Sequence, residues 1–187
     1  LLAKYRTADR PLPIAKYFAM CEWWDETVGE LLAMLDQRKL SENTIVIYLA
    51  DNGWIQQPDS PGYAPKSKRS PYDGGLRTPI LVKWPGHVTP AQIETPVSSI
   101  DVVPTILAAT GVEPKEKLPG LNLLDIAKNG GKTGQTALFG EVLDHDVADI
   151  DNPAVSLQYR WTLSEARWKL ILPNAAGTPE KPQLSAA

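Results

Sequence analysis

Two neighbouring side chains with oxygen donors follow a short apolar segment of the chain. Asp51 and Asn52, with Gly53 after them, come directly after the β-branched run of residues 44–50. A carboxylate and an amide oxygen side by side are hard ligands of the type that Ca²⁺ or Mg²⁺ prefers. The tripeptide is also typical of a tight turn, because Asp, Asn and Gly tolerate left-handed conformations. Taken alone it favours the turn, whereas the residues around it favour a metal site.

Two cations stand downstream of this pair. Lys68 lies four residues before Tyr72, in a segment that can fold back over the end of the apolar run. Its ammonium can neutralise an anionic oxyacid ester and its leaving oxygen, although a lone lysine in a loop is most often solvated. Arg77 follows Gly74 and Gly75, which permit a backbone bend. We interpret Arg77 as one side of a structural ion pair beside the site, with anion binding as the alternative.

A third polar group and one aromatic residue complete the candidates. Glu141, Asp144, His145 and Asp146 lie together after an apolar run, so His145 lines a substrate pocket, binds metal or belongs to a solvated loop. The solvated loop is the commonest of these outcomes for such spacing. Trp54 directly follows the Asp-Asn-Gly tripeptide, and among the six tryptophans it is the best candidate for contacting a substrate.

The elements expected around these residues form an α/β unit. Residues 44–50 lack polar alternation and predict a strand buried on both faces, whose carboxyl end is where an open α/β sheet binds ligands. Residues 13–39 predict an amphipathic helix, with Cys21 on its apolar stripe as a small buried side chain. Residues 53–70 are rich in Pro, Gly, Ser and Gln and predict a long loop, a kind of segment that is usually functional.

Further elements are expected along the rest of the chain. The predicted helices lie at residues 101–110 and 121–128, and the predicted strands at residues 79–84, 136–143, 156–163 and 167–172. The last three strands follow one another without helices, which indicates a small antiparallel sheet. We therefore expect residues 1–132 to belong to an α/β domain and residues 133–187 to form a C-terminal antiparallel-sheet subdomain.

Composition limits the functions that are open to the chain. Its 187 residues are 43% hydrophobic, enough for a core, and a net charge of -3 gives no footprint for nucleic acid or an anionic membrane. The single cysteine excludes an internal disulfide, and no apolar stretch is long enough to span a bilayer. Because the chain opens without an initiating methionine, we expect a piece of a longer protein.

Several ordered segments of the chain are similar to those of a known enzyme family. They are Trp24-Asp25-Glu26-Thr27-Val28-Gly29, Asn43-Thr44-Ile45-Val46 leading into Asp51-Asn52-Gly53, Lys68-Arg69-Ser70-Pro71-Tyr72-Asp73-Gly74-Gly75-Leu76-Arg77-Thr78-Pro79, Trp84-Pro85-Gly86, Ile100-Asp101-Val102-Val103-Pro104-Thr105-Ile106-Leu107 and Arg167-Trp168-Lys169-Leu170-Ile171. With these segments the chain resembles the carboxyl-terminal part of the type I, formylglycine-dependent sulfatases of the alkaline-phosphatase-like superfamily. The resemblance implies a partial alkaline-phosphatase-like α/β sandwich, followed by the small antiparallel subdomain.

The resemblance also implies roles for three of the candidate residues. Asp51 and Asn52 match a late pair of calcium ligands, with Mg²⁺ as the alternative ion, and Lys68 matches a lysine that contacts the sulfate group. Such enzymes hydrolyse sulfate esters with a formylglycine made from a Cys/Ser-x-Pro-x-Arg motif, which does not occur in these 187 residues. We therefore expect the formylglycine upstream of Leu1, and the chain by itself to be inactive. The resemblance further suggests a secreted or periplasmic protein.

Two other functions remain open. A phosphate or phosphonate monoester hydrolase of the same superfamily would share the sheet, although such relatives more often place histidine after the aspartate and hold transition metals. A non-catalytic homologue would bind anionic glycans without cleaving them. For the sulfatase, the expected partner is a sulfated small molecule or glycan, and the sequence leaves the oligomeric state open.

Overall fold

The chain divides into two compact units, Leu1–His87 and Val88–Ala187. The computed structural model describes residues 1–144, 149, 151–174 and 180–186. The predicted boundary near Lys132 lies inside the second unit, and the division there into an α/β domain and an antiparallel-sheet subdomain stays a prediction. None of the helices in the described part of the chain combines the length and the apolar character that a membrane span requires.

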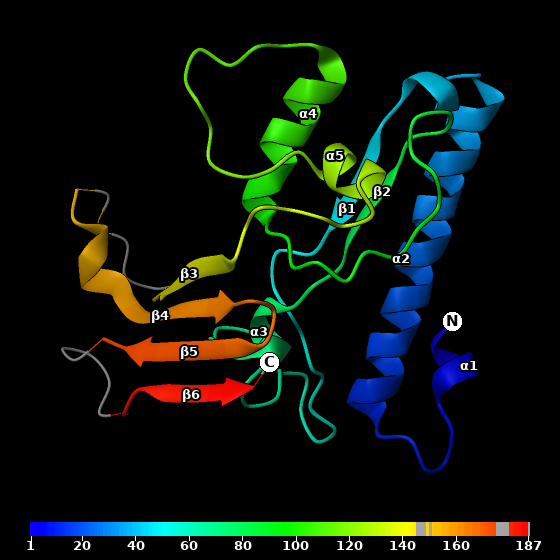
Figure 1. The fold of residues 1–187 in the computed structure, drawn as a ribbon. Helices are drawn as coiled ribbons and strands as arrows, with labels where there is room; N and C mark the ends of the chain where they lie inside the picture. Colours follow the sequence, from blue (N-terminus) through cyan, green and yellow to red (C-terminus); the bar gives the residue numbers. More distant parts are fainter. Residues whose placement is uncertain (145–148, 150, 175–179, 187) are drawn as a thin grey trace. The chain divides into compact units, whose positions relative to one another are not determined.

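The first unit holds one long helix and a two-stranded sheet (Figure 1). Its elements are α1 (Leu2–Tyr5), α2 (Leu12–Gln37), the 3₁₀-helix η1 (Ser41–Asn43), β1 (Val46–Leu49), α3 (Asp73–Leu76) and β2 (Ile80–Lys83). Pro13 lies in the first turn of α2, where its missing N–H costs nothing, and the helix ends before Lys39, whose φ is 58°. Lys4 of α1 and Glu22 of α2 form an ion pair, whose hydrogen bond raises the pKa of Lys4 and lowers the pKa of Glu22.

β1 and β2 pair antiparallel, with Leu49 opposite Ile80. The prediction of a strand in residues 44–50 is confirmed, but its burial on both faces is not. The side chains of β1 are half-buried, and Leu49 is 36% exposed. Among the described residues β2 is the only strand that pairs with β1, and Tyr48 contacts Trp24 of α2 with ring centroids 6.1 Å apart. Burial depends on how many neighbours cover a strand, which the run of apolar residues does not reveal.

α2 carries an apolar stripe that stays largely exposed. Among its residues, Ala15 alone is buried, whereas Trp24 is 54% and Leu31 50% exposed. Cys21 is exposed as well, so the prediction that it is a small buried side chain is wrong. The helical periodicity of apolar residues marks the face that favours packing, but burial also requires an element that covers this face.

The second unit combines short helices with a four-stranded antiparallel sheet (Figure 1). Its elements are the 3₁₀-helices η2 (Ser99–Asp101) and η3 (Pro153–Ser156), the helices α4 (Val102–Thr110) and α5 (Leu123–Lys128), and the strands β3 (Ala137–Leu143), β4 (Leu157–Ser164), β5 (Trp168–Pro173) and β6 (Gln183–Ala186). The strands lie in the order β3-β4-β5-β6, and each pairs antiparallel with the next. The predicted antiparallel sheet is confirmed, and β6 adds a strand that the sequence did not indicate.

Two buried polar side chains tie the start of α4 to the segment that leads into α5. Asp101 is 1% exposed, and its carboxylate accepts hydrogen bonds from the N–H groups of Ser98 and Leu121, both at 2.7 Å. Thr105 is fully buried, and its hydroxyl donates to the Asp101 carbonyl and accepts from the Leu123 N–H. These side chains therefore satisfy backbone groups that have no partner in a helix or sheet.

Asp101→Ala should lower the free energy of unfolding by about 2–3 kcal/mol, because it leaves two N–H groups inside the unit without an acceptor. Urea denaturation measures this loss. Asp125→Ala is the matched control, because Asp125 is an exposed aspartate of α5 whose removal should change stability by roughly 0.5 kcal/mol or less. Equal unfolding midpoints for the two variants would contradict the role given to Asp101.

Candidate functional site

Asp51 and Asn52 follow β1 after one intervening residue, Ala50, at the strand end that the sequence predicts for them. Asp51 is exposed and Asn52 is half-buried. The Asn52 N–H donates to Asp51 Oδ1 at 2.9 Å, and Asn52 Nδ2 donates to the Gly53 carbonyl at 3.0 Å. These bonds orient both side chains and leave Asp51 Oδ2 and Asn52 Oδ1 without a hydrogen bond among the described residues. Two hard oxygens therefore remain available to a cation.

Gly53 ties this strand end to α3. Its N–H donates to the Gly75 carbonyl at 2.8 Å, and a Cβ at Gly53 would overlap the Gly74 carbonyl. Gly53 and Gly75 are both buried. Glycine is required here because a side chain would occupy the space of the neighbouring backbone. The Asp-Asn-Gly tripeptide is therefore docked on α3 by its third residue.

Ser67 fastens the backbone next to Lys68 to the same place. Its side chain is fully buried, and its hydroxyl oxygen accepts a hydrogen bond from the Ile55 N–H at 2.6 Å. The Ser67 carbonyl accepts from the Ser70 hydroxyl at 2.6 Å, and a Cβ at Gly75 would overlap that carbonyl. The loop that carries Lys66 and Lys68 is called the lysine loop below. We call Gly53, Ser67 and Gly75 the site frame, because they join the strand end, the lysine loop and α3.

The two lysines of this loop lie over different aromatic rings. Lys68 Nζ is 5.9 Å from the centroid of the Trp54 ring, and Lys66 Nζ is 4.7 Å from the centroid of the Tyr72 ring. Both distances suit a cation–π interaction. Trp54 follows the Asp-Asn-Gly tripeptide directly in the chain, so this contact places the Lys68 ammonium beside the residue that comes after the candidate metal ligands.

Arg77 and His145 are the two remaining predicted site residues. Arg77 directly follows α3, and its side chain is exposed. It forms no ion pair with any residue that the structure describes, so the ion pair expected for it is not found there. His145 lies outside the described residues. Its neighbour Glu141 forms an ion pair with Arg160, with 3.0 Å between Oε1 and Nε, so this carboxylate links β3 to β4.

The donors at the strand end suit part of a calcium shell. Ca²⁺ takes roughly six to eight oxygen ligands, and Asp51 and Asn52 offer one available oxygen each. Over residues 1–144, 149, 151–174 and 180–186, no cluster of three or more His, Cys, Asp or Glu side chains could hold a metal ion by itself. The pair fits calcium by ligand type and needs further oxygen ligands to complete the shell.

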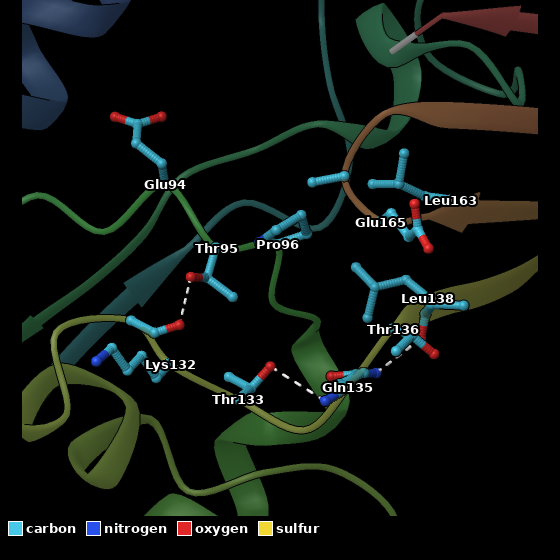
Figure 2. Close-up of a pocket in the computed structure, with 13 residues that line it drawn as sticks. Glu94, Thr95, Pro96, Lys132, Thr133, Gln135, Thr136, Leu138, Leu163 and Glu165 are labelled. Atoms are coloured by element: carbon cyan, nitrogen blue, oxygen red, sulfur yellow. Dashed lines mark hydrogen bonds between the residues drawn. The ribbon is translucent and has the colours of Figure 1, made fainter.

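A cavity of about 530 Å³ lies in the second unit (Figure 2). Residues 94–96, residues from 131 to 138 and the tip of the β4–β5 hairpin line it. The charged groups among these residues are the carboxylates of Glu94 and Glu165 and the ammonium of Lys132. The excess of negative charge opposes the binding of a sulfate or phosphate ester, so this cavity is a poor candidate for the anion site.

The site frame cannot be recognised from the sequence alone. The pair Gly74 and Gly75 indicates a backbone bend, and in the structure neither has a positive φ, while neighbouring atoms leave no room for a Cβ at either position. Ser67 belongs to no motif, because its hydrogen bonds depend on which segments fold against each other. The one available signal was the concentration of Gly, Ser and Pro in residues 53–70, which is typical of tightly packed loops.

Two family models match the chain. Residues 2–112 match the family described as Sulfatase, and residues 63–173 match the family described as N-sulphoglucosamine sulphohydrolase, C-terminal. The chain is also 34% identical over 120 residues to human arylsulfatase A, a match that covers 62% of this chain and 24% of that protein. The chain thus spans about a quarter of the length of the curated relatives that it matches.

Solved structures share the fold. A Bacteroides thetaiotaomicron structure, described under the metabolism of multiple glycosaminoglycans, matches with a TM-score of 0.70 and 26% identity, over 92% of this chain and 36% of that chain. A phosphonate monoester hydrolase from Silicibacter pomeroyi matches with a TM-score of 0.68 and 22% identity, over 87% and 32%. At the latter identity the likeness concerns the fold alone. These matches confirm the predicted α/β fold of the alkaline-phosphatase-like class with a small antiparallel sheet near the C-terminus.

Proposed function

Because the chain belongs to the sulfatase family, we propose that it is the carboxyl-terminal part of an enzyme that hydrolyses sulfate esters. The observation that supports this proposal is the cation–π contact of Lys68 with Trp54, which follows Asp51 and Asn52 closely in the chain after β1. A metal-ligand pair and an ammonium group at one strand end supply two sources of positive charge for the oxygens of a sulfate ester.

Asp51 and Asn52 hold a Ca²⁺ ion in this proposal. A carboxylate and an amide oxygen favour calcium over zinc, which prefers imidazole and thiolate donors. Mg²⁺ is the alternative ion because it also takes oxygen ligands. The bound ion supplies positive charge that stabilises the negative oxygens of the sulfate group. The hydrogen bonds from the Asn52 N–H to Asp51 and from Asn52 Nδ2 to the Gly53 carbonyl orient the two ligands beforehand.

Lys68 acts on the sulfate group itself. Its ammonium is a compact charge that donates hydrogen bonds to sulfate oxygens and neutralises the charge that develops on the leaving oxygen. Because Ser67 of the site frame is buried and hydrogen-bonded, the backbone that carries Lys68 is fixed. Arg77 is an exposed cation without an ion pair in the described part of the chain, which suits the binding of a second anionic group of the substrate. His145 stays a further candidate for substrate binding.

The nucleophile of the proposed reaction lies outside these 187 residues. They contain no Cys/Ser-x-Pro-x-Arg motif, and Cys21 is exposed on α2 in a different sequence context. Human arylsulfatase A is about four times as long as the segment that matches it. A formylglycine made from such a motif elsewhere in the protein would supply the hydrated aldehyde that attacks sulfur. We therefore propose that turnover requires the longer protein and that this segment alone is inactive.

The proposed substrate is a sulfated sugar or another small sulfate ester. One matched family is that of N-sulphoglucosamine sulphohydrolase, and one matched structure is described under glycosaminoglycan metabolism. The half-buried Trp54 ring beside Lys68 offers an aromatic face of the kind that contacts sugar rings. By analogy with the family, we propose a secreted or periplasmic location for the protein.

The choice of ester and of metal separates this function from the alternatives. The full-length protein should cleave para-nitrophenyl sulfate with a kcat/KM roughly 100-fold above that for para-nitrophenyl phosphate, because the families that the chain matches are those of sulfatases. Chelation with EGTA should abolish turnover, and Ca²⁺ should restore it.

Asp51→Ala should raise the Ca²⁺ concentration for half-maximal activity at least about 10-fold, because it removes the charged ligand. Steady-state kinetics against free Ca²⁺ measures these changes.

Other outcomes of the same assay favour the other two functions. Preferential cleavage of the phosphate ester with Zn²⁺ or Mn²⁺ would support a phosphate or phosphonate monoester hydrolase. Binding of a sulfated glycan without turnover of either ester would support a non-catalytic anionic-glycan-binding homologue, which has no need of a formylglycine motif.

A further inference from the structure

Trp54 is held in place from two sides. Its ring and the Tyr63 ring pack in a T-shaped arrangement, with centroids 5.3 Å apart and an interplanar angle of 65°. Its Nε1 donates a hydrogen bond to Gln56 Oε1 at 3.3 Å. The indole is half-buried between these contacts, and the Lys68 ammonium lies over its ring. The ring that Lys68 contacts is therefore itself oriented by neighbouring side chains.

The loop that supplies Tyr63 is cross-linked by its own glutamines. The two N–H groups of Gln56 Nε2 are shared among the carbonyls of Gln57, Ser60 and Gly62, at 3.1, 2.8 and 2.9 Å. The Gln57 side chain donates through Nε2 to the Tyr63 carbonyl at 2.7 Å, and its Oε1 accepts from the Ser60 hydroxyl at 2.9 Å. These bonds add to the backbone pairing of the loop, in which the Gln57 N–H donates to the Gly62 carbonyl at 3.1 Å. The loop is therefore held in one conformation by its own hydrogen bonds, and it supports the Tyr63 and Trp54 rings.

The side chain of Lys68 is long, and a flexible ammonium loses conformational freedom when it binds an anion. A lysine side chain carries about 2 kcal/mol of rotamer entropy. Ser67 fixes the backbone of Lys68, but only a contact to the side chain can reduce this entropy. Among the described residues, the Trp54 ring is the aromatic face within cation–π distance of the Lys68 ammonium.

We propose that Trp54 is a positioning residue for Lys68, holding the ammonium over its ring so that the anion-binding group of the site is oriented before the ester binds. This inference rests on the proposed function for the role of Lys68, and it goes beyond that function by assigning a task to Trp54, Tyr63 and Gln56. Trp54 acts through Lys68 here, and direct contact with the substrate is not required.

A double-mutant cycle in the full-length enzyme tests the inference. Trp54→Ala should lower kcat/KM for methyl sulfate, an ester without a sugar ring that the Trp54 face could contact, by about 3- to 30-fold when Lys68 is present, the range expected from one cation–π contact. It should have no further effect in the Lys68→Ala background, because its partner is gone. Trp54→Phe should recover most of the activity, since it keeps an aromatic face. Trp23→Ala, which removes a tryptophan that is 65% exposed on α2, is the matched control and should leave kcat/KM unchanged.

Equal losses from Trp54→Ala in both backgrounds would overturn the inference, because a structural role or a direct substrate contact acts whether or not Lys68 is present. If Trp54→Ala does not fold, the double-mutant cycle is carried out with Trp54→Leu and with Tyr63→Leu, which disturb the same packing less severely. For Tyr63→Leu the expected loss is smaller than for Trp54→Ala and is also confined to the background that retains Lys68.

A second measurement is independent of sulfatase activity. After ¹³C-dimethylation of the lysines of the full-length protein, the Lys68 resonance, identified by its loss in Lys68→Arg, should be shifted upfield by the Trp54 ring. Trp54→Ala should move it to the position of solvated lysines, while the Lys66 resonance over Tyr72 stays in place as an internal control. An unchanged Lys68 resonance in Trp54→Ala would overturn the inference. If Lys68→Ala retained full activity, the proposed function would fall, and the resonance would still decide whether Trp54 holds Lys68.

Discussion

Lys68→Ala in the full-length enzyme is expected to lower kcat/KM for a sulfate ester by about 10²–10³-fold, the usual cost of removing one group that stabilises charge in a transition state. Lys68 is half-buried and its ammonium lies over Trp54, so its removal takes away a charge without opening a cavity in the core. The free energy of unfolding should therefore change little. Steady-state kinetics, together with urea denaturation of the same variant, checks both expectations.

Lys66 provides a matched control for this prediction. It lies two residues earlier in the same loop, is exposed and has its ammonium 4.7 Å from the Tyr72 ring centroid. Lys66→Ala removes the same charge from the loop but not from the strand end, so it should lower kcat/KM by less than about 3-fold. A large loss in Lys66→Ala with near-normal activity in Lys68→Ala would show that the two lysines have been assigned the wrong way round.

Local signals in the sequence were sufficient to predict the main helices and strands. The helix in residues 13–39, the strand in residues 44–50 and the antiparallel sheet after residue 133 all follow from apolar periodicity and turn residues, and the structure contains each of them. The placement of Asp51 at a strand end follows from the same local pattern. These features depend on neighbours along the chain, which the sequence displays directly.

Burial and packing could not be predicted in the same way. The apolar stripe of α2 marks the right face of a helix, yet Trp24 stays 54% exposed although it contacts Tyr48, and Cys21 is exposed as well. The hydroxyl oxygen of Ser67 accepts a hydrogen bond from the N–H of Ile55, twelve residues away in the chain, and no sequence spacing predicts such a bond. Contacts of this kind depend on how loops fold against each other, so they appear only in the structure.

Gly75→Ala is expected to disrupt the site and lower the free energy of unfolding by about 3–4 kcal/mol, near the upper end for overpacking. A Cβ at this position would overlap the Ser67 carbonyl and lie 2.6 Å from the Ser70 carbonyl. Both are backbone atoms, which cannot rotate away as the end of a long side chain can. This overlap can be relieved only if the lysine loop moves away from α3. That movement displaces Lys68.

The activity of Gly75→Ala should fall further than its stability alone explains, because Ser67 links the displaced carbonyl to the backbone beside Lys68. Urea denaturation measures the stability, and kcat/KM at a temperature where the variant stays folded measures the displacement. Gly62→Ala is the control, since a Cβ there meets nothing closer than the Ser60 hydroxyl at 3.5 Å, an ordinary contact. If Gly75→Ala proved as stable and as active as Gly62→Ala, the site frame would not be what positions Lys68, and the close approach between Gly75 and the lysine loop would have to be absent in the full-length protein.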